Sequence, residues 1–305
     1  MRQILGLIAM SGALALACPA KAQDAGVVPP DTAWARYPSA TSVRIEGAAA
    51  IVRVTPQMRS DSAYVIVNTG PLPDPEVRVR GARLIIDGGL ERRIEGCAFG
   101  ESVTVRGFGN VPLAQLPVIY VRTPESLVLE ANGGLAIEVG PSTSARVGVS
   151  GCSQARIGPV TQQASVALEG NAMAQIGPSG RARIAIAGDG QAILGPVSQG
   201  LDIAIAGDGR VQVQTIGGDV RVGIQGDGYV DIGSGQIDEL RVAIAGDGYV
   251  RFAGEADTVT AAIAGSGLIE VARARGAVEQ RVAGNGEVRV GPLGPAPHAL
   301  DTPRP

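Results

Sequence analysis

The feature that most constrains this chain is a turn motif that recurs about every 19 residues through its C-terminal part. Each clear copy reads as an aliphatic residue, a small or polar residue, and then Gly-x-Gly. The first glycines of these copies are Gly188, Gly207, Gly226, Gly246, Gly265 and Gly284. Weaker copies at Gly133, Gly151 and Gly170 extend the series to nine, with gaps of 18–20 residues. A period this regular is typical of a solenoid, whose repeats stack to bury a shared core.

Hydrophobic alternation inside each repeat predicts strands rather than helices. After the Gly-x-Gly turn, two alternate positions are apolar and the residue between them is mostly polar, as in Val211-Gln212-Val213. This is the period of a strand with one face turned inward. We therefore expect an all-β fold over residues 126–292, a right-handed β-helix or solenoid with ~19-residue coils.

The remaining regions are assigned by composition. Residues 41–125 contain strand-like runs without the clean period and are expected to form an N-terminal flanking β region. Residues 23–40 contain Pro29 and Pro30 and are interpreted as a linker. Residues 293–305 are interpreted as a disordered, proline-rich tail.

The N-terminus, residues 1–22, has the organisation of a secretory signal peptide. Arg2 precedes an apolar run, and Ala20-Lys21-Ala22 fits a cleavage site before Gln23. The alternative is a lipoprotein in which Cys18 carries the lipid. No later segment is apolar over the length that a span requires, so we expect no membrane span in the mature chain.

Charge and residue usage argue against two functional classes. The chain has 26 basic and 29 acidic residues, a net charge of −3, so nothing favours nucleic-acid binding. Its only lysine, Lys21, lies in the signal peptide, and its only histidine, His298, lies in the tail. Lysine-based and histidine-based catalysis therefore have no residues in the folded region, and we expect neither an enzyme nor a cofactor. A carbohydrate-active β-helix enzyme is a less favoured alternative, which an acidic cleft breaking the repeat would support.

Four aspartates recur at the turns, namely Asp189, Asp208, Asp227 and Asp247. Stacked carboxylates repel one another unless they are solvated or bridged by a cation, so calcium is one interpretation. The other is that these aspartates satisfy turn backbone groups, as Ser266 would in the same slot. We favour the second and treat the four residues only as weak metal candidates.

The first strand of each repeat has small apolar residues on its outward face, including Ala185, Ala204, Ala243 and Ala262. A strand that is apolar on both sides is normally covered on both sides. The covering layer is expected to be the N-terminal region or a second copy of the chain, unless the small residues merely ease stacking.

Two further pairs of residues, one of tyrosines and one of cysteines, each have two interpretations. Tyr229 and Tyr249 occupy equivalent outward slots on neighbouring coils. Their stacked rings are either a platform that binds a sugar or a structural ladder on the surface. Cys97 and Cys152 remain in the mature chain and are either a disulfide or two separate buried thiols.

The ordered turns, together with residues 43–54 and 117–124, resemble the auto-transporter adhesins with a head GIN domain. The resemblance covers about residues 41–292, although relatives usually have Ser-Gly-Ser-Gly where this chain has Ala-Gly-Asp-Gly. It implies an exported β-helical envelope protein and brings no catalytic residues. We therefore expect a non-enzymatic adhesin or cell-envelope interaction module that binds a glycan or an envelope or surface protein. Its expected location is the periplasm, the outer surface or the extracellular space. The alternative is a periplasmic structural or scaffold protein.

Overall fold

The computed structural model describes residues 34–293 apart from residues 38, 59–61, 68–69 and 99. The expected signal peptide with Cys18, and nearly all of the tail with His298, lie outside the described residues. Within the described part, no helix is long and apolar enough to cross a membrane.

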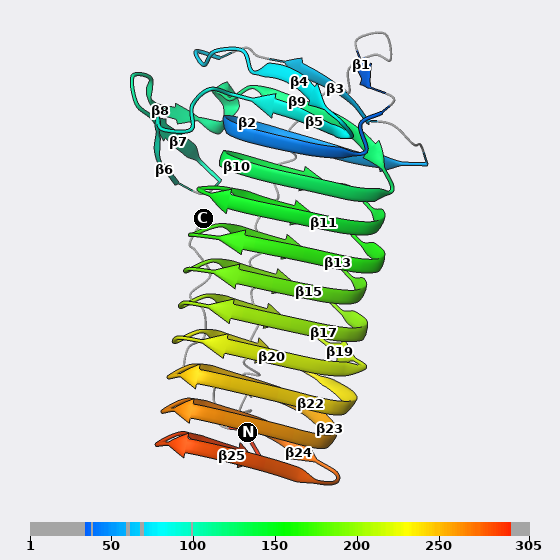
Figure 1. The fold of residues 1–305 in the computed structure, drawn as a ribbon, viewed down its shortest axis with the longest axis vertical. Helices are drawn as coiled ribbons and strands as arrows, with labels where there is room; N and C mark the ends of the chain where they lie inside the picture. The colour runs from blue at the N-terminus through cyan, green and yellow to red at the C-terminus, as the bar shows by residue number, and fades with distance from the viewer. Residues whose placement is uncertain (1–33, 38, 59–61, 68–69, 99, 294–305) are drawn as a thin grey trace, which may run out of the picture. The chain divides into compact units, whose positions relative to one another are not determined.

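Most strands stack in two columns of parallel, hydrogen-bonded neighbours (Figure 1). The first column consists of β10 (Ser126–Val139), β11 (Ser142–Gly151), β13 (Val160–Glu169), β15 (Ser179–Ala187), β17 (Val197–Ala206), β20 (Asp219–Gln225), β22 (Gly235–Gly246), β23 (Tyr249–Gly265) and β25 (Val278–Gly284). The second consists of the end of β10, β12 (Gln154–Ile157), β14 (Met173–Ile176), β16 (Gln191–Leu194), β18 (Arg210–Val213), β21 (Tyr229–Ile232), the start of β23, β24 (Leu268–Ala274) and β26 (Glu287–Val290). The short β19 (Ile216–Gly217) lies between β17 and β22. Each coil therefore contributes one long and one short strand.

The pairing register follows the sequence repeat. Ile184 lies beside Ile203, and Ile203 lies beside Val222, so equivalent residues of successive repeats are neighbours. About nine turns of roughly 19 residues stack in this way, which confirms the all-β solenoid.

The N-terminal end of the stack is covered by additional strands. β2 (Ser42–Gln57) lies parallel to β10, and β5 (Arg83–Asp87) and β9 (Val118–Pro124) lie parallel to β2 on its other side. Antiparallel strands complete this end: β4 (Glu76–Arg80) on β5, β3 (Ser62–Val67) on β9, and β1 (Ala35–Tyr37) on β3. The stacking of coils therefore continues into the flanking region, and β1 forms a strand within the range expected to be a linker.

A separate three-stranded antiparallel sheet flanks the first coils. It consists of β6 (Ile94–Ala98), β7 (Ser102–Val105) and β8 (Gly109–Pro112), followed by the 3-10 turn η2 (Leu113–Gln115). Its apolar side chains form a second small core with Ala49 of β2. Cys97 of β6 forms a disulfide with Cys152, with the two Cα atoms 6.0 Å apart, so the pair is not two separate thiols. The disulfide links this sheet covalently to the solenoid.

The main core is one continuous column of side chains inside the coils. The predicted inward positions are buried from coil to coil. Examples are Val211, Val230, Val250 and Phe252, whose side chains are each 0% exposed. The last coil differs: Val290 was expected to be buried, but it is 43% exposed because no coil follows it among the described residues.

Backbone geometry explains why the turn glycines recur. Gly207 has φ +119°, a region that residues with a Cβ rarely adopt, and a Cβ there would lie 2.8 Å from the carbonyl oxygen of Gly188. A Cβ on Gly209 would lie 2.6 Å from the side chain of Ile186 in the preceding coil. Both glycines of the turn are therefore required by the close stacking of coils.

Candidate functional site

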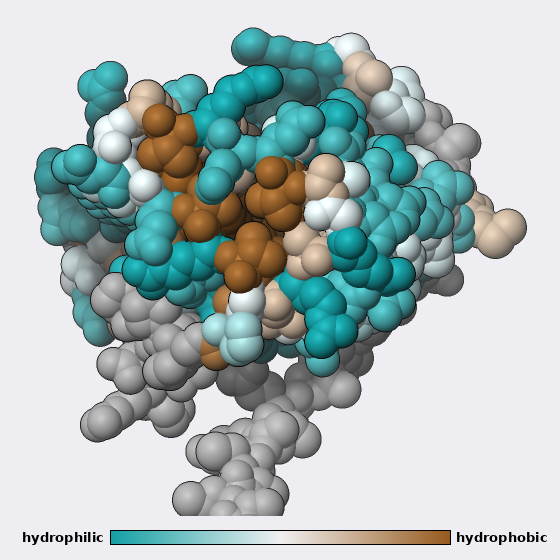
Figure 2. Space-filling model, turned by 90° about the horizontal axis from the view of Figure 1, so that it is seen from below, coloured by the Kyte–Doolittle hydropathy of each residue, from teal (hydrophilic) through white to brown (hydrophobic). Residues whose placement is uncertain are grey.

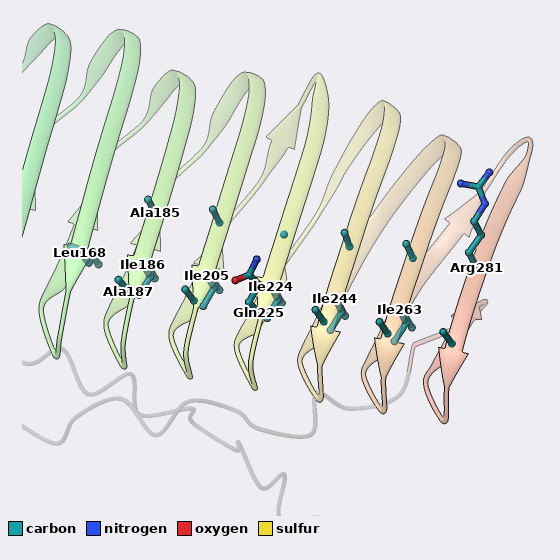
Figure 3. A pocket seen from close by; sticks show the side chains of 18 of the residues that line it. Leu168, Ala185, Ile186, Ala187, Ile205, Ile224, Gln225, Ile244, Ile263 and Arg281 are labelled. Atoms are coloured by element: carbon teal, nitrogen blue, oxygen red, sulfur yellow. The ribbon is translucent and has the colours of Figure 1, made fainter.

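The main candidate surface is a shallow apolar groove that runs across the outward side of the first strand column. Its volume is about 880 Å³. Two rows of residues line it, one containing Ala185, Ala204, Gly223, Ala243 and Ala262 and the other containing Ala187, Ala206, Gln225, Ala245 and Ala264. We call these two rows the alanine face. Figure 3 shows their short side chains at equivalent positions on successive coils, ending at Arg281.

The flatness of this face follows from its side chains. All eight alanines are exposed, while the isoleucines between them, such as Ile186 and Ile205, point into the core. Because a methyl group projects little beyond the backbone, the rows form an open surface rather than an enclosed cavity. Such a surface can contact a flat partner over several coils, and it offers no enclosed volume for a reaction.

Charged side chains border the alanine face on one side. A second depression of about 460 Å³ adjoins the groove there and is lined by Arg183, Asp202, Arg221 and Arg241. Asp202 lies 3.5 Å from Arg183 and 3.8 Å from Arg221, so these ion pairs join neighbouring coils. This border is predominantly basic. Sequence reasoning missed it, although the residues lie two positions before the alanine column and the aligned repeats contain the pattern.

The opposite border is acidic, because it is formed by the turns. Asp189, Asp208, Asp227 and Asp247 are all exposed at the end of the first strand column. Asp247 accepts a hydrogen bond from the backbone N–H of Ser266 on the next coil, at 3.2 Å. Among the described residues, no three His, Cys, Asp or Glu side chains come together as a metal site. The contact made by Asp247 is the one expected of a turn residue.

No described part of the N-terminal region covers the alanine face. The N-terminal region was one of the two layers expected there, but the described strands of residues 41–125 lie on the end of the stack and beside the first coils instead. The physical reason is that β2, β5 and β9 continue the hydrogen-bonded columns, which places them along the stack axis instead of over its side. Coverage by a second copy stays a prediction.

The tyrosines are neighbours, as the register predicts, but they do not form an open platform. The rings of Tyr229 and Tyr249 stack with centroids 5.2 Å apart and planes at 20°. Tyr229 occupies the expected outward slot but is only 6% exposed, because neighbouring residues cover its ring; this burial raises the pKa of its hydroxyl. Tyr249 donates a hydrogen bond of 2.5 Å to Glu270. The pair therefore forms a structural ladder between coils.

Comparisons with known proteins agree with this architecture. Residues 196–294 match the family described as "Putative auto-transporter adhesin, head GIN domain". A crystal structure of a putative adhesin from Parabacteroides distasonis superposes with TM-score 0.55 at 14% identity, covering 84% of this chain and 95% of that chain. A putative adhesin from Parabacteroides merdae gives TM-score 0.53 at 14% identity, covering 84% and 94%. No curated protein matches the chain. At this identity, the two structures support the fold.

Proposed function

With residues 196–294 matched to the head GIN adhesin family, we propose that this chain is an exported, non-enzymatic adhesion module that binds through its alanine face. The observation that carries the proposal is the flat apolar groove of about 880 Å³, which extends over successive coils without an enclosed pocket. Large exposed apolar surfaces on folded proteins commonly mark interaction sites.

The groove and its borders favour contact with a repetitive partner. Most coils present the same small outward residues, with a basic border formed by residues such as Arg221 and an acidic border formed by residues such as Asp227. One coil supplies only a weak contact, but contacts on successive coils act together when the partner is also repetitive. A glycan or an elongated envelope or surface protein meets this requirement.

The first experiment is protease treatment of intact producing cells, followed by immunoblotting for residues 23–305 with a periplasmic protein as control. We expect digestion of this protein while the control survives, as required of a surface adhesin. Protection until the outer membrane is permeabilised would refute surface adhesion and favour the periplasmic scaffold.

The binding face is tested with labelled mature chain added to the same cells. Ala204→Arg adds a long charged side chain in the middle of the alanine face and should reduce retention at least tenfold. Gln175→Arg adds the same side chain at an exposed position on the second strand column and should retain binding. Pretreating cells with periodate or with protease separates a glycan partner from a protein partner. Equal retention of both variants would refute binding through this face.

A second copy of the chain is another proposed occupant of the alanine face, through Ala185, Ala204, Ala243 and Ala262. A two-fold axis parallel to the stack would place the basic border of each copy against the acidic border of the other. Loss of a dimer in Ala204→Arg, with the dimer kept in Gln175→Arg, would support this arrangement.

A further inference from the structure

The two ends of the coil stack differ in how they are closed. At the N-terminal end, β5 and β9 cover β2, and their side chains Leu84, Ile86 and Ile119 are each 0% exposed. At the other end, β25 pairs only with β23, and β26 pairs only with β24, within the described chain. The outer edge of the last coil therefore presents unpaired backbone groups, which are a template for pairing with another strand.

Core-facing side chains are uncovered at this open end. Val278 is 39% exposed and Val282 is 42% exposed, whereas Val259 and Ile263, their neighbours one coil earlier, are 1% and 2% exposed. Figure 2 looks onto this end of the stack and shows hydrophobic residues in the centre with hydrophilic residues around them. Terminal repeats of solenoids normally need a polar cap. Among the described residues this coil has no such cap, so its valines are available for contact with another chain.

The outward side chains of β25 carry opposite charges in a self-complementary order. Glu279 and Arg281 flank Gln280, are exposed, and form no ion pair with each other or with another described residue. On β26 the situation differs, because Arg289 already binds Glu287 at 2.6 Å and Glu270 at 3.4 Å. Two unpaired opposite charges therefore lie two residues apart on a strand with a free edge.

We propose that a second copy of this chain docks on the open end, with the two β25 strands antiparallel about a two-fold axis at Gln280. In an antiparallel pair, residues equidistant from the axis lie opposite each other. Glu279 of each copy then faces Arg281 of the other copy, and Val278 faces Val282. The pairing satisfies the free backbone edge, matches both charges and covers the exposed valines.

The symmetry limits this contact to two copies of the chain. The same surface is used on both copies, so the contact is self-complementary and closes on itself. Head-to-tail stacking would instead require a free parallel edge at the N-terminal end, where antiparallel β3 and β4 lie. Four of residues 294–305 are prolines, which cannot donate the backbone hydrogen bonds that a strand edge needs.

The interface is small, so the dimer should be reversible. A seven-residue strand is about 23 Å long, and the two walls of the coil are about 10 Å apart, which limits the contact to the area of one coil end. This is well below the roughly 800 Å² per partner of a standard stable interface. We expect the dimer to be populated at high micromolar concentration and to dissociate on dilution.

The test is sedimentation equilibrium of the full mature chain over a concentration series, with charge variants on β25. Glu279→Arg places two guanidinium groups opposite each other, and Arg281→Glu places two carboxylates opposite each other, so each should weaken association at least tenfold. The double variant Glu279→Arg/Arg281→Glu restores opposite charges and should associate within a few-fold of the wild type. Because both residues are exposed, folding should be unaffected, and circular dichroism verifies this. Gln175→Arg is the surface control.

Three results would overturn the proposal. The first is a wild-type chain that stays monomeric at the highest concentration. A chain that dimerises only after residues 294–305 are removed counts as the same result. The second is single variants that associate like the wild type, or a double variant that is not rescued. The third is a dimer that is lost in Ala204→Arg but kept in Glu279→Arg, which would place self-association on the alanine face instead of the open end.

Discussion

Replacing Gly207 with alanine tests whether the stacking of coils requires the repeated glycine. Gly207 has φ +119°, and holding a residue with a Cβ in such a region costs about 1–3 kcal/mol. The new Cβ would lie 2.8 Å from the carbonyl oxygen of Gly188. The backbone must therefore shift, and this overpacking adds about 1–3 kcal/mol. The free energy of unfolding should fall by about 2–6 kcal/mol in total.

The matched control is Gly223→Ala, on the same stack and one coil away. Gly223 has no positive φ, and its nearest contact for a new Cβ is the carbonyl oxygen of Ile203 at 4.0 Å. Alanine also occupies the neighbouring positions of that row, Ala204 and Ala243. This substitution should raise the free energy of unfolding by about 0.4–1 kcal/mol, because it lowers the entropy of the unfolded chain.

Guanidinium chloride unfolding followed by far-UV circular dichroism measures both changes. The slope of the transition must also be compared, because solenoids can unfold in segments and a changed slope would indicate lost cooperativity. An unfolding free energy for Gly207→Ala within about 0.5 kcal/mol of the wild type, the range of ordinary surface substitutions, would refute the steric account of the repeat.

Three further perturbations have expected outcomes. Cys152→Ser removes the disulfide to Cys97 and should lower the free energy of unfolding by about 2–4 kcal/mol in the same assay; no difference between oxidised wild type and variant would contradict this. Burial, followed by the hydrogen bond to Glu270, raises the pKa of Tyr249, so the folded state holds its proton after the unfolded state has lost it. The contribution of Tyr249 to the free energy of unfolding should therefore be complete below pH 10 and should fall as the pH rises above it. A late phase of tyrosinate absorbance should disappear in Tyr249→Phe, and an unchanged titration would contradict the assignment. Calcium or EDTA should leave the Tm unchanged, because Asp247 serves the turn backbone; a calcium-dependent rise of several degrees would restore the metal interpretation.

The core of the solenoid could be predicted because its pattern is local and repeated. Alternation at Val211 and Val213 specifies which face is buried, and the constant spacing of glycines specifies which residues stack. At Gly207 and Gly209 a Cβ would come too close to the preceding coil, so the structure requires glycine there and the requirement is visible in the sequence. The aligned repeats also predict the outward alanines, such as Ala185 and Ala204, that form the alanine face.

Contacts between non-repeated segments could not be predicted in this way. The sequence placed Tyr229 on the outward side correctly, yet only its neighbours in three dimensions bury its ring. The sequence could not decide whether Cys97 and Cys152 form a disulfide or stay separate thiols, because their separation of 55 residues says nothing about where β6 packs.

The sequence by itself therefore determined the strand period, the coil length, the inward columns and the position of the alanine face, since each depends on residues one or two positions apart or one repeat apart. Only the tertiary structure decided that β2, β5 and β9 close one end of the stack and leave the side of the solenoid uncovered. It also decided that the edge of β25 is open, with Glu279 and Arg281 unpaired within the described chain. The reason is physical: burial at an end depends on whether another segment packs there, and no residue in the repeat encodes that contact.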